Sequence, residues 1–188
     1  MPRLHLVRHG RSAADPATAP DTWGLDPAGR GDLDALRDGS ALPRGAVWFS
    51  SPEAKALETA CWLTDTPVTV VPELAEHRRG VHWFADQADF RAAVRRAFAR
   101  PEERAVPQWE PLSAARDRLV PAVRTLLAAH PDDDVVLVGH GTAWTLLVSE
   151  LTGRPPDLEA WAALRMPDVW EVPRPAAPPD RPASYGTA

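Results

Sequence analysis

The chain contains Val135-Val136-Leu137-Val138-Gly139-His140-Gly141, an unbroken apolar run that ends on a histidine between two glycines. Such a run is typical of a parallel strand that is covered on both faces of its sheet. Near the N-terminus, residues 3–7 form a second apolar-rich run, which stops at Arg8-His9-Gly10. Ligands of parallel α/β sheets bind at the carboxyl ends of the strands. Two strands that end on histidines therefore predict a functional site at that edge.

The rest of the chain alternates between strand-like and helix-like segments. Further strands are expected at 46–50 and 68–71, with one or two edge strands within 161–172. Helices are expected at 26–37, 51–64, 86–100, 112–130 and 142–151, the first two opened by Asp26-Pro27 and Ser51-Pro52. This order predicts an α/β fold, a three-layer α/β/α sandwich with a mostly parallel sheet and a small helical and loop cap.

The length fits one domain. We expect a catalytic domain over residues 1–172, a cap segment at about 73–111, and a mobile Pro/Ala-rich tail at 173–188. The net charge of −5 argues against nucleic acid or an anionic membrane as the main partner, but a local cluster of Arg and His can still bind a small anion. The single cysteine, Cys61, and the lack of a signal-like N-terminus predict a cytoplasmic protein. The sequence leaves monomer and homodimer open.

The residues at the two strand ends suit phosphoryl transfer. A neutral imidazole at His9 can attack phosphorus and hold the phosphoryl group, which divides one difficult displacement into two easier ones. Arg8 offers a planar fork for two phosphate oxygens, and Gly10 allows close backbone approach. His140 can donate to the same phosphate, and the Ser51-Pro52 helix start adds backbone donors. Read singly, either histidine could be a structural one, but together they favour the functional interpretation.

Hydrolysis also needs an acid for the leaving oxygen and a base for the attacking water. A carboxylate in a partly apolar pocket suits both steps, because burial is expected to raise its pKa toward neutrality. Glu76 and Glu73 are the candidates, since both follow the third expected strand. The basic run His77, Arg78, Arg79 and His82 is either a solvated face or a contact for an acidic substrate.

Four segments, in this order, resemble the histidine phosphatase superfamily, which is also called phosphoglycerate mutase-like: Leu6-Val7-Arg8-His9-Gly10, Ser50-Ser51-Pro52 with Glu58-Thr59-Ala60 behind it, Leu74-Ala75-Glu76, and Val138-Gly139-His140-Gly141. Asp26-Pro27-Ala28-Gly29-Arg30 is similar to the segment that opens the family's first helix. The resemblance covers about residues 3–150.

The resemblance implies a role for each matching residue. His9 is the phosphorylated nucleophile, Arg8 and His140 belong to the phosphate pocket, and Glu76 is the proton donor and then the base. Ser12 matches a hydroxyl residue that contacts phosphate, and Gly141 is expected among the phosphate-binding residues. The family hydrolyses its substrates without a metal or a cofactor, so none is expected here.

Three positions depart from the family pattern. Lys55 stands where the family has a second pocket arginine, and lysine lacks the bidentate fork. Asp15 stands where an asparagine is common, and a carboxylate near a phosphate repels it. Arg11 stands where an acidic or amide residue is common, and it is a candidate partner for Asp15.

The sequence thus predicts a phosphatase that acts on a small phosphorylated substrate through His9. Three alternatives stay open: mutase-like phosphoryl transfer, a protein phosphohistidine phosphatase, and a phosphate-binding regulatory module with weak turnover. Lys55 and Asp15 are the motive for the last of these.

Overall fold

Five strands form one sheet in the computed structural model, which describes residues 2–81 and 83–174. The strand order is β3-β2-β4-β1-β5, with bounds β1 Leu4–Arg8, β2 Val47–Ser50, β3 Val68–Val70, β4 Val135–Gly139 and β5 Asp168–Val172. The first four strands are parallel, and β5 pairs antiparallel with β1. The expected mostly parallel sheet is confirmed.

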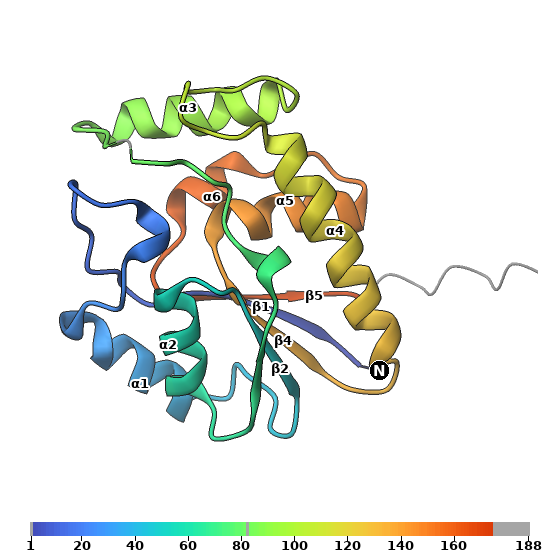
Figure 1. The fold of residues 1–188 in the computed structure, drawn as a ribbon. Helices are drawn as coiled ribbons and strands as arrows, with labels where there is room; N and C mark the ends of the chain where they lie inside the picture. The colour runs from blue at the N-terminus through green and yellow to red at the C-terminus, as the bar shows by residue number, and fades with distance from the viewer. Residues whose placement is uncertain (1, 82, 175–188) are drawn as a thin grey trace, which may run out of the picture.

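Helices cover both faces of the sheet, as Figure 1 shows. On one side lie α1 (Arg30–Asp38) and α2 (Ala54–Leu63), and on the other lie α4 (Leu112–Ala129) and α5 (Gly141–Thr152). Alternate strand residues serve the two layers, because successive side chains of a strand point to opposite faces. In β4, Val135 and Leu137 pack with α4 and α5, while Val136 and Val138 pack with α1 and α2. The three-layer sandwich is therefore confirmed.

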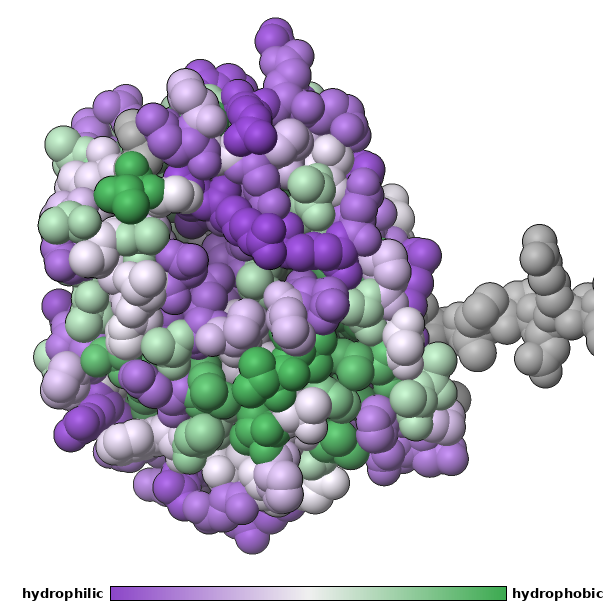
Figure 2. All heavy atoms as spheres, in the orientation of Figure 1, coloured by the Kyte–Doolittle hydropathy of each residue, from purple (hydrophilic) through white to green (hydrophobic). Residues whose placement is uncertain are grey.

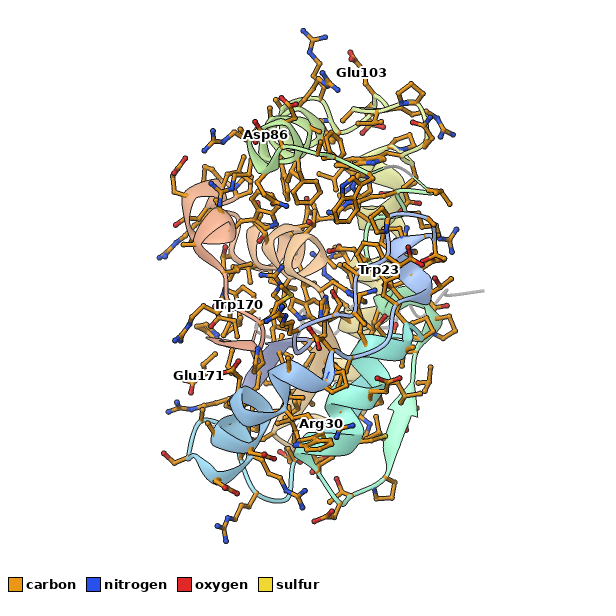
Figure 3. All side chains as sticks on the ribbon, turned by 90° about the vertical axis from the view of Figure 1, so that its left-hand side faces the viewer. Trp23, Arg30, Asp86, Glu103, Trp170 and Glu171 are labelled. Carbon is orange, nitrogen blue, oxygen red and sulfur yellow. The ribbon has the colours of Figure 1, made fainter. Side chains whose placement is uncertain are left out.

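The segment between β3 and α4 lies over the carboxyl edge of the sheet, with α3 (Gln87–Ala99) at the top of Figure 1. It has an apolar core of its own, in which Val94, Ala97, Val106 and Trp109 are buried. Leu146 of α5 joins this cluster, which fixes the segment to the body of the molecule. Figure 3 shows the molecule turned by 90° about the vertical axis: Asp86 and Glu103 mark the cap at the top, and Arg30 marks the α1–α2 layer below.

Two helix starts differ from the sequence predictions. The segment opened by Asp26-Pro27 begins as a short 3-10 turn, Pro27–Gly29, and the α-helix starts only at Arg30. The segment opened by Ser51-Pro52 becomes helical only at Ala54, with Glu53 as its N-cap residue. The reason is that the Ser51 backbone N–H still pairs with the Val138 carbonyl oxygen (2.9 Å), which extends the sheet by one residue.

The C-terminal region contains one edge strand, β5, preceded by a helix that the sequence reading missed, α6 (Leu158–Ala163). Asp157 caps this helix, because its carboxylate accepts a hydrogen bond from the Ala160 N–H (2.8 Å). Two further 3-10 turns lie at Pro20–Thr22 and Pro72–Leu74. The expected tail falls largely on residues 175–188, outside the described part of the chain.

The upper half of the face in Figure 2 is mostly hydrophilic, apart from one apolar group at its upper left, whereas apolar side chains gather in the lower half. Val70 of the edge strand β3 is 42% exposed. No helix in the described ranges is both long enough and apolar enough to cross a membrane.

Candidate active site

The sheet register brings the two strand-end histidines together. Arg8 of β1 is opposite Gly139 of β4, so the next residue of each strand, His9 and His140, meet at the carboxyl edge. Their ring centroids are 5.2 Å apart, and both side chains are buried. The sequence prediction of a site at this edge therefore corresponds to a real juxtaposition.

Three hydrogen bonds hold the turn that carries His9. Trp144 donates its indole N–H to the Val7 carbonyl oxygen (2.9 Å), and the Gly10 N–H donates to the Thr59 hydroxyl (2.9 Å). The His9 Nδ1 donates to the Gly10 carbonyl oxygen at 2.7 Å, because a carbonyl oxygen can only accept. This bond assigns the proton to Nδ1 and leaves the Nε2 lone pair free to act as a nucleophile.

Both histidines are held in the neutral form. Burial lowers the pKa of His9 well below its usual 6.5, with the charges of His140, Lys55 and Arg8 acting in the same direction. Burial also lowers the pKa of His140 to about 3, despite the opposing charge of Glu76. A neutral imidazole at His9 is the form required for attack on phosphorus.

These pKa shifts predict that the protein is destabilised by mild acid. The unfolded chain protonates His9 and His140 below pH 6.5, whereas the folded chain keeps them neutral to a much lower pH. Stability is thus lost as the pH falls from 6.5, and His140, whose pKa is about 3 in the folded chain, accounts for about 1 kcal/mol of the loss between pH 7 and pH 5.5. His9 adds to this loss, as do His5 and His77, because burial lowers their pKa values too. Urea unfolding at the two pH values measures this difference. His9→Asn is expected to make it smaller, and an unchanged difference in that variant would contradict the neutral assignment of His9.

A buried carboxylate, Glu53, lies beside His140. The His140 Nε2 is 2.7 Å from the Ser51 hydroxyl and 3.4 Å from Glu53 Oε1. Lys55 donates to Glu53 Oε2 (2.5 Å) and to the Pro20 carbonyl oxygen (2.5 Å). The charge of Lys55 is therefore already paired inside the site. One ammonium hydrogen stays available for a phosphate oxygen.

Glu76 caps the N-terminus of α5. Its Oε1 accepts from the N–H groups of His77 and Ala143 (both 2.9 Å), and its Oε2 accepts from the Thr142 N–H (3.2 Å). Burial raises the pKa of this carboxyl. Arg79, His140 and the His77 N–H together lower it by more, so that the pKa is about 2. The expectation that burial brings Glu76 toward neutrality is therefore wrong for the unliganded protein, because these donors stabilise the ionised form.

Arg8 is anchored from the segment between α6 and β5. Its Nη1 donates to the carbonyl oxygens of Leu164 (2.9 Å) and Arg165 (3.2 Å). The Nε is buried and has no hydrogen-bond partner among the described residues. The guanidinium is thus held in place with donor capacity left over at the edge of the sheet.

One cavity of about 910 Å³ contains the expected residues. Among those lining it are the predicted residues Arg8, His9, Ser12, Lys55, Glu76, His140 and Gly141. Its outer wall is aromatic: Trp23 comes from the loop before α1 and Trp83 from the cap, and their ring centroids are 6.3 Å apart. Figure 3 shows Trp23 between the cap and the α1–α2 layer.

Three residues considered from the sequence do not line this cavity. Glu73 is exposed in a 3-10 turn, so the geometry favours Glu76 as the acid. Asp15 is exposed, and its carboxylate accepts from the Ala17 N–H (2.9 Å). Arg11 pairs with Asp26 (2.9 Å) and not with Asp15, because the Asp26 N–H also bonds to the Arg11 carbonyl oxygen and brings the two residues together.

Glu53 and Arg79 are charged residues that line the cavity and had no assigned part in the site prediction. Glu53 was missed, and only its place directly after Ser51-Pro52 could have drawn attention to it. Arg79 was one member of a basic run, and the structure separates it from its neighbours: Arg79 is largely buried, whereas Arg78 is exposed. His82, also in that run, lies outside the described residues. Within residues 2–81 and 83–174, no group of three or more His, Cys, Asp or Glu side chains is placed to hold a metal ion.

The chain belongs to the histidine phosphatase superfamily (branch 1), whose family model matches residues 4–168. This membership agrees with the resemblance seen in the sequence and makes the protein a phosphatase of this class. A comparison with curated proteins finds no match.

Solved structures share the fold. A mycobacterial glucosyl-3-phosphoglycerate phosphatase superposes with a TM-score of 0.70 at 23% identity, over 90% of this chain and 89% of that one. The same enzyme in complex with vanadate gives 0.68 at 25% identity, over 91% and 92%. A phosphoserine phosphatase from Entamoeba histolytica gives 0.69 at 16% identity, over 91% and 90%.

Proposed function

We propose that the protein hydrolyses a small phosphate monoester, without a metal, through a phosphohistidine intermediate on His9. The observation that carries this proposal is the pair of buried, neutral histidines at adjacent strand ends, with the His9 proton held on Nδ1. Family membership supports the same chemistry. The names of the similar phosphatases, which refer to glucosyl-3-phosphoglycerate and phosphoserine, support a small-molecule substrate.

The first step is attack by His9 Nε2 on phosphorus. The phosphorus–nitrogen bond forms, the ester bond breaks, and Glu76 gives a proton to the leaving oxygen. Glu76 is ionised in the free protein. A bound phosphate next to the carboxylate raises its proton affinity, so the proton is taken up with the substrate. In the second step Glu76 accepts a proton from water, the water oxygen attacks phosphorus, and His9 is released.

The phosphate is held by a mixed set of donors. Arg8 supplies a guanidinium, His140 an imidazole and Lys55 its remaining ammonium hydrogen. The Ser12 hydroxyl and the Gly141 backbone N–H lie in the same cavity. Gly141 is the first residue of α5, where the helix dipole favours an anion.

The test is phosphate release from sugar, nucleotide and carboxylic-acid phosphates, with and without a chelator. Release that survives chelation, together with an acid-labile and base-stable phosphoenzyme, is the expected result. Release that depends on added metal, or turnover with no phosphoenzyme on His9, would contradict the mechanism.

The paired lysine leads to a further prediction about phosphate affinity. Glu53→Gln removes a carboxylate from the phosphate site and frees the charge of Lys55, so vanadate and phosphate are expected to inhibit about tenfold more tightly. Lys55→Arg is expected to tighten binding as well, since it restores a bidentate fork. Inhibition constants measure both effects. Glu73→Gln, an exposed substitution of the same kind, serves as the control. Unchanged or weaker inhibition in Glu53→Gln would mean that the Glu53–Lys55 pair stays closed when phosphate binds.

The same pair favours a second candidate function, a phosphate-binding module with weak turnover. A buried carboxylate 3.4 Å from His140 opposes a bound dianion. The two functions differ in one observable: a phosphatase forms and releases the His9 phosphoryl group, whereas a binding module retains phosphate without turnover.

Several broader expectations accompany the proposal. We take residues 1–172 as the catalytic domain, with a cap at about 73–111. A cytoplasmic location and a monomeric or homodimeric state remain predictions from the sequence.

A further inference from the structure

Arg118 of α4 binds the backbone that carries Glu76. Its Nη2 donates to the carbonyl oxygens of Ala75 (3.2 Å) and Glu76 (2.6 Å), which belong to the two peptide groups on either side of the Glu76 Cα. Its Nη1 donates to Glu110 Oε1 (2.7 Å), and both charged side chains are largely buried, with 16% and 14% exposed. Hydrogen bonds from a charged donor are stronger than neutral ones, so Arg118 holds this part of the backbone firmly.

Glu110 completes the attachment. Its Oε1 also accepts from the Arg78 N–H (2.8 Å), and its own backbone N–H donates to the Arg78 carbonyl oxygen (3.0 Å). The Glu110 carbonyl oxygen accepts from His77 Nε2 (2.8 Å). Arg118 and Glu110, here called the Glu110–Arg118 pair, therefore bind each of residues 75–78.

The attachment matters because this stretch has no regular structure of its own. Residues 75–80 belong to neither a helix nor a strand, so no regular ladder of backbone hydrogen bonds fixes them. The Glu76 carboxylate is bound separately, by the N–H groups of Thr142 and Ala143 in α5. The residue is thus held between two helices, with its backbone on α4 and its carboxylate on α5.

The Glu110–Arg118 pair itself lies outside the cavity, so it can act on the reaction only through the residues that it binds. It is not needed merely to join α4 to the cap, because apolar contacts already do so: Leu112 of α4 and Val94 of α3 belong to one buried cluster. A buried ion pair is also a weak source of net stability, since desolvation offsets the attraction of the charges. These observations favour a role in setting the position of Glu76.

We propose that Arg118, held by Glu110, is a positioning residue that sets where the Glu76 carboxylate meets the leaving oxygen. The inference rests on the proposed function, in which Glu76 protonates that oxygen. Proton transfer requires the two groups to be within hydrogen-bond reach, and a misplacement of about 1 Å can cost about 10²-fold in rate. Loss of Arg118 removes the donor that fixes both peptide groups beside Glu76, so the carboxylate is expected to shift away from the leaving oxygen.

Two leaving groups test the inference. Arg118→Gln is expected to slow phosphoenzyme formation by about 10- to 100-fold on an alkyl phosphate, but by less than about threefold on 4-nitrophenyl phosphate, whose leaving group needs no proton. Arg118→Lys keeps the charge but loses the planar fork that spans Glu110 and the two carbonyl oxygens, so its loss on the alkyl phosphate is expected to be intermediate.

The control is Arg116→Gln. Arg116 lies on the same helix, outside the cavity, and pairs with Asp117 (3.0 Å). This variant removes a charge and an ion pair from α4 without touching the backbone at Glu76, and it is expected to leave both rates unchanged. Urea unfolding of each variant identifies those that are folded.

A combined variant separates positioning from a purely structural role. If Arg118 acts only through Glu76, Arg118→Gln adds no further loss on the alkyl phosphate when Glu76→Gln is already present. A full additional loss in the double variant, or equal slowing of both substrates, would overturn the inference, because the pair would then support the fold alone. Should Arg118→Gln fail to fold, Arg118→Lys takes its place in the same comparison.

The same measurements distinguish a failure of this inference from a failure of the proposed function. If Glu76→Gln slows the alkyl and nitrophenyl substrates alike, Glu76 is not the acid, and the positioning role is overturned together with that assignment. If Glu76→Gln shows the leaving-group dependence and the Arg118 variants do not, the acid stands and the positioning role alone is overturned.

Discussion

His9→Ala is expected to lower kcat by about 10⁴-fold or more on every substrate that the wild-type chain hydrolyses. The reason is that the variant loses the atom that forms the covalent bond to phosphorus. The His140 Nε2 is already engaged with the Ser51 hydroxyl at 2.7 Å, so His140 is not expected to take over this role. Steady-state phosphate release and trapping of the labelled phosphoenzyme measure the effect.

Two controls keep this result interpretable. His9→Asn retains an amide N–H near the Gly10 carbonyl oxygen and so preserves the local turn, yet it is expected to be equally inactive. His130→Ala alters a histidine at the far end of α4, outside the cavity, and is expected to leave turnover unchanged. A folded His9→Asn or His9→Ala variant with wild-type turnover would refute the covalent mechanism.

The fold was predictable because its main determinants are local and periodic. The apolar run of β4 and the short apolar run of β1 define strands that must be covered on both faces. Chain direction then places both carboxyl ends at one edge. The sequence does not encode the register of the pair so directly, yet that register, Arg8 opposite Gly139, sets the distance between His9 and His140. Helix α6 was missed because a segment of six residues carries too little periodicity to be recognised.

The electrostatics of the site were harder to predict from the sequence than the identity of the residues that form it. Glu53 reads as an ordinary charged residue near a helix start, and only the tertiary structure shows that its carboxylate is buried between Lys55 and His140. Arg79 and Arg78 are indistinguishable in sequence. Only the tertiary structure shows that Arg79 packs against the rings of Phe90 and Trp109, whereas Arg78 is exposed.

The case of Glu76 shows why a burial argument alone fails for a pKa. Burial does act in the expected direction and is the largest single cause, but Arg79, His140 and the His77 N–H together lower the pKa by more. Whether a buried acid is neutral depends on the donors around it, and these come from residues far away in the sequence. The proton that Glu76 needs is therefore expected to arrive with the substrate.

Glu76→Gln is expected to lower kcat by about 10²- to 10⁴-fold for alkyl phosphates, whose leaving alkoxide needs a proton. For 4-nitrophenyl phosphate the loss of phosphoenzyme formation is expected to be much smaller, because this leaving group departs as a stable anion. A glutamine side chain keeps an oxygen that can accept from the Ala143 N–H, so the cap of α5 is retained. Pre-steady-state measurement of phosphoenzyme formation on both substrates separates this step from the later attack by water.

A difference between the two substrates in Glu76→Gln would distinguish an acid at Glu76 from a residue that only caps α5. If Glu76 only held α5 in place, Glu76→Gln would slow both substrates alike, and that outcome would sink the assignment. Glu73→Gln is the matched control, since Glu73 is exposed three residues earlier and outside the cavity. Should Glu73→Gln show the leaving-group dependence and Glu76→Gln lack it, the acid would be Glu73, which would require the 3-10 turn at Pro72–Leu74 to rearrange when substrate binds.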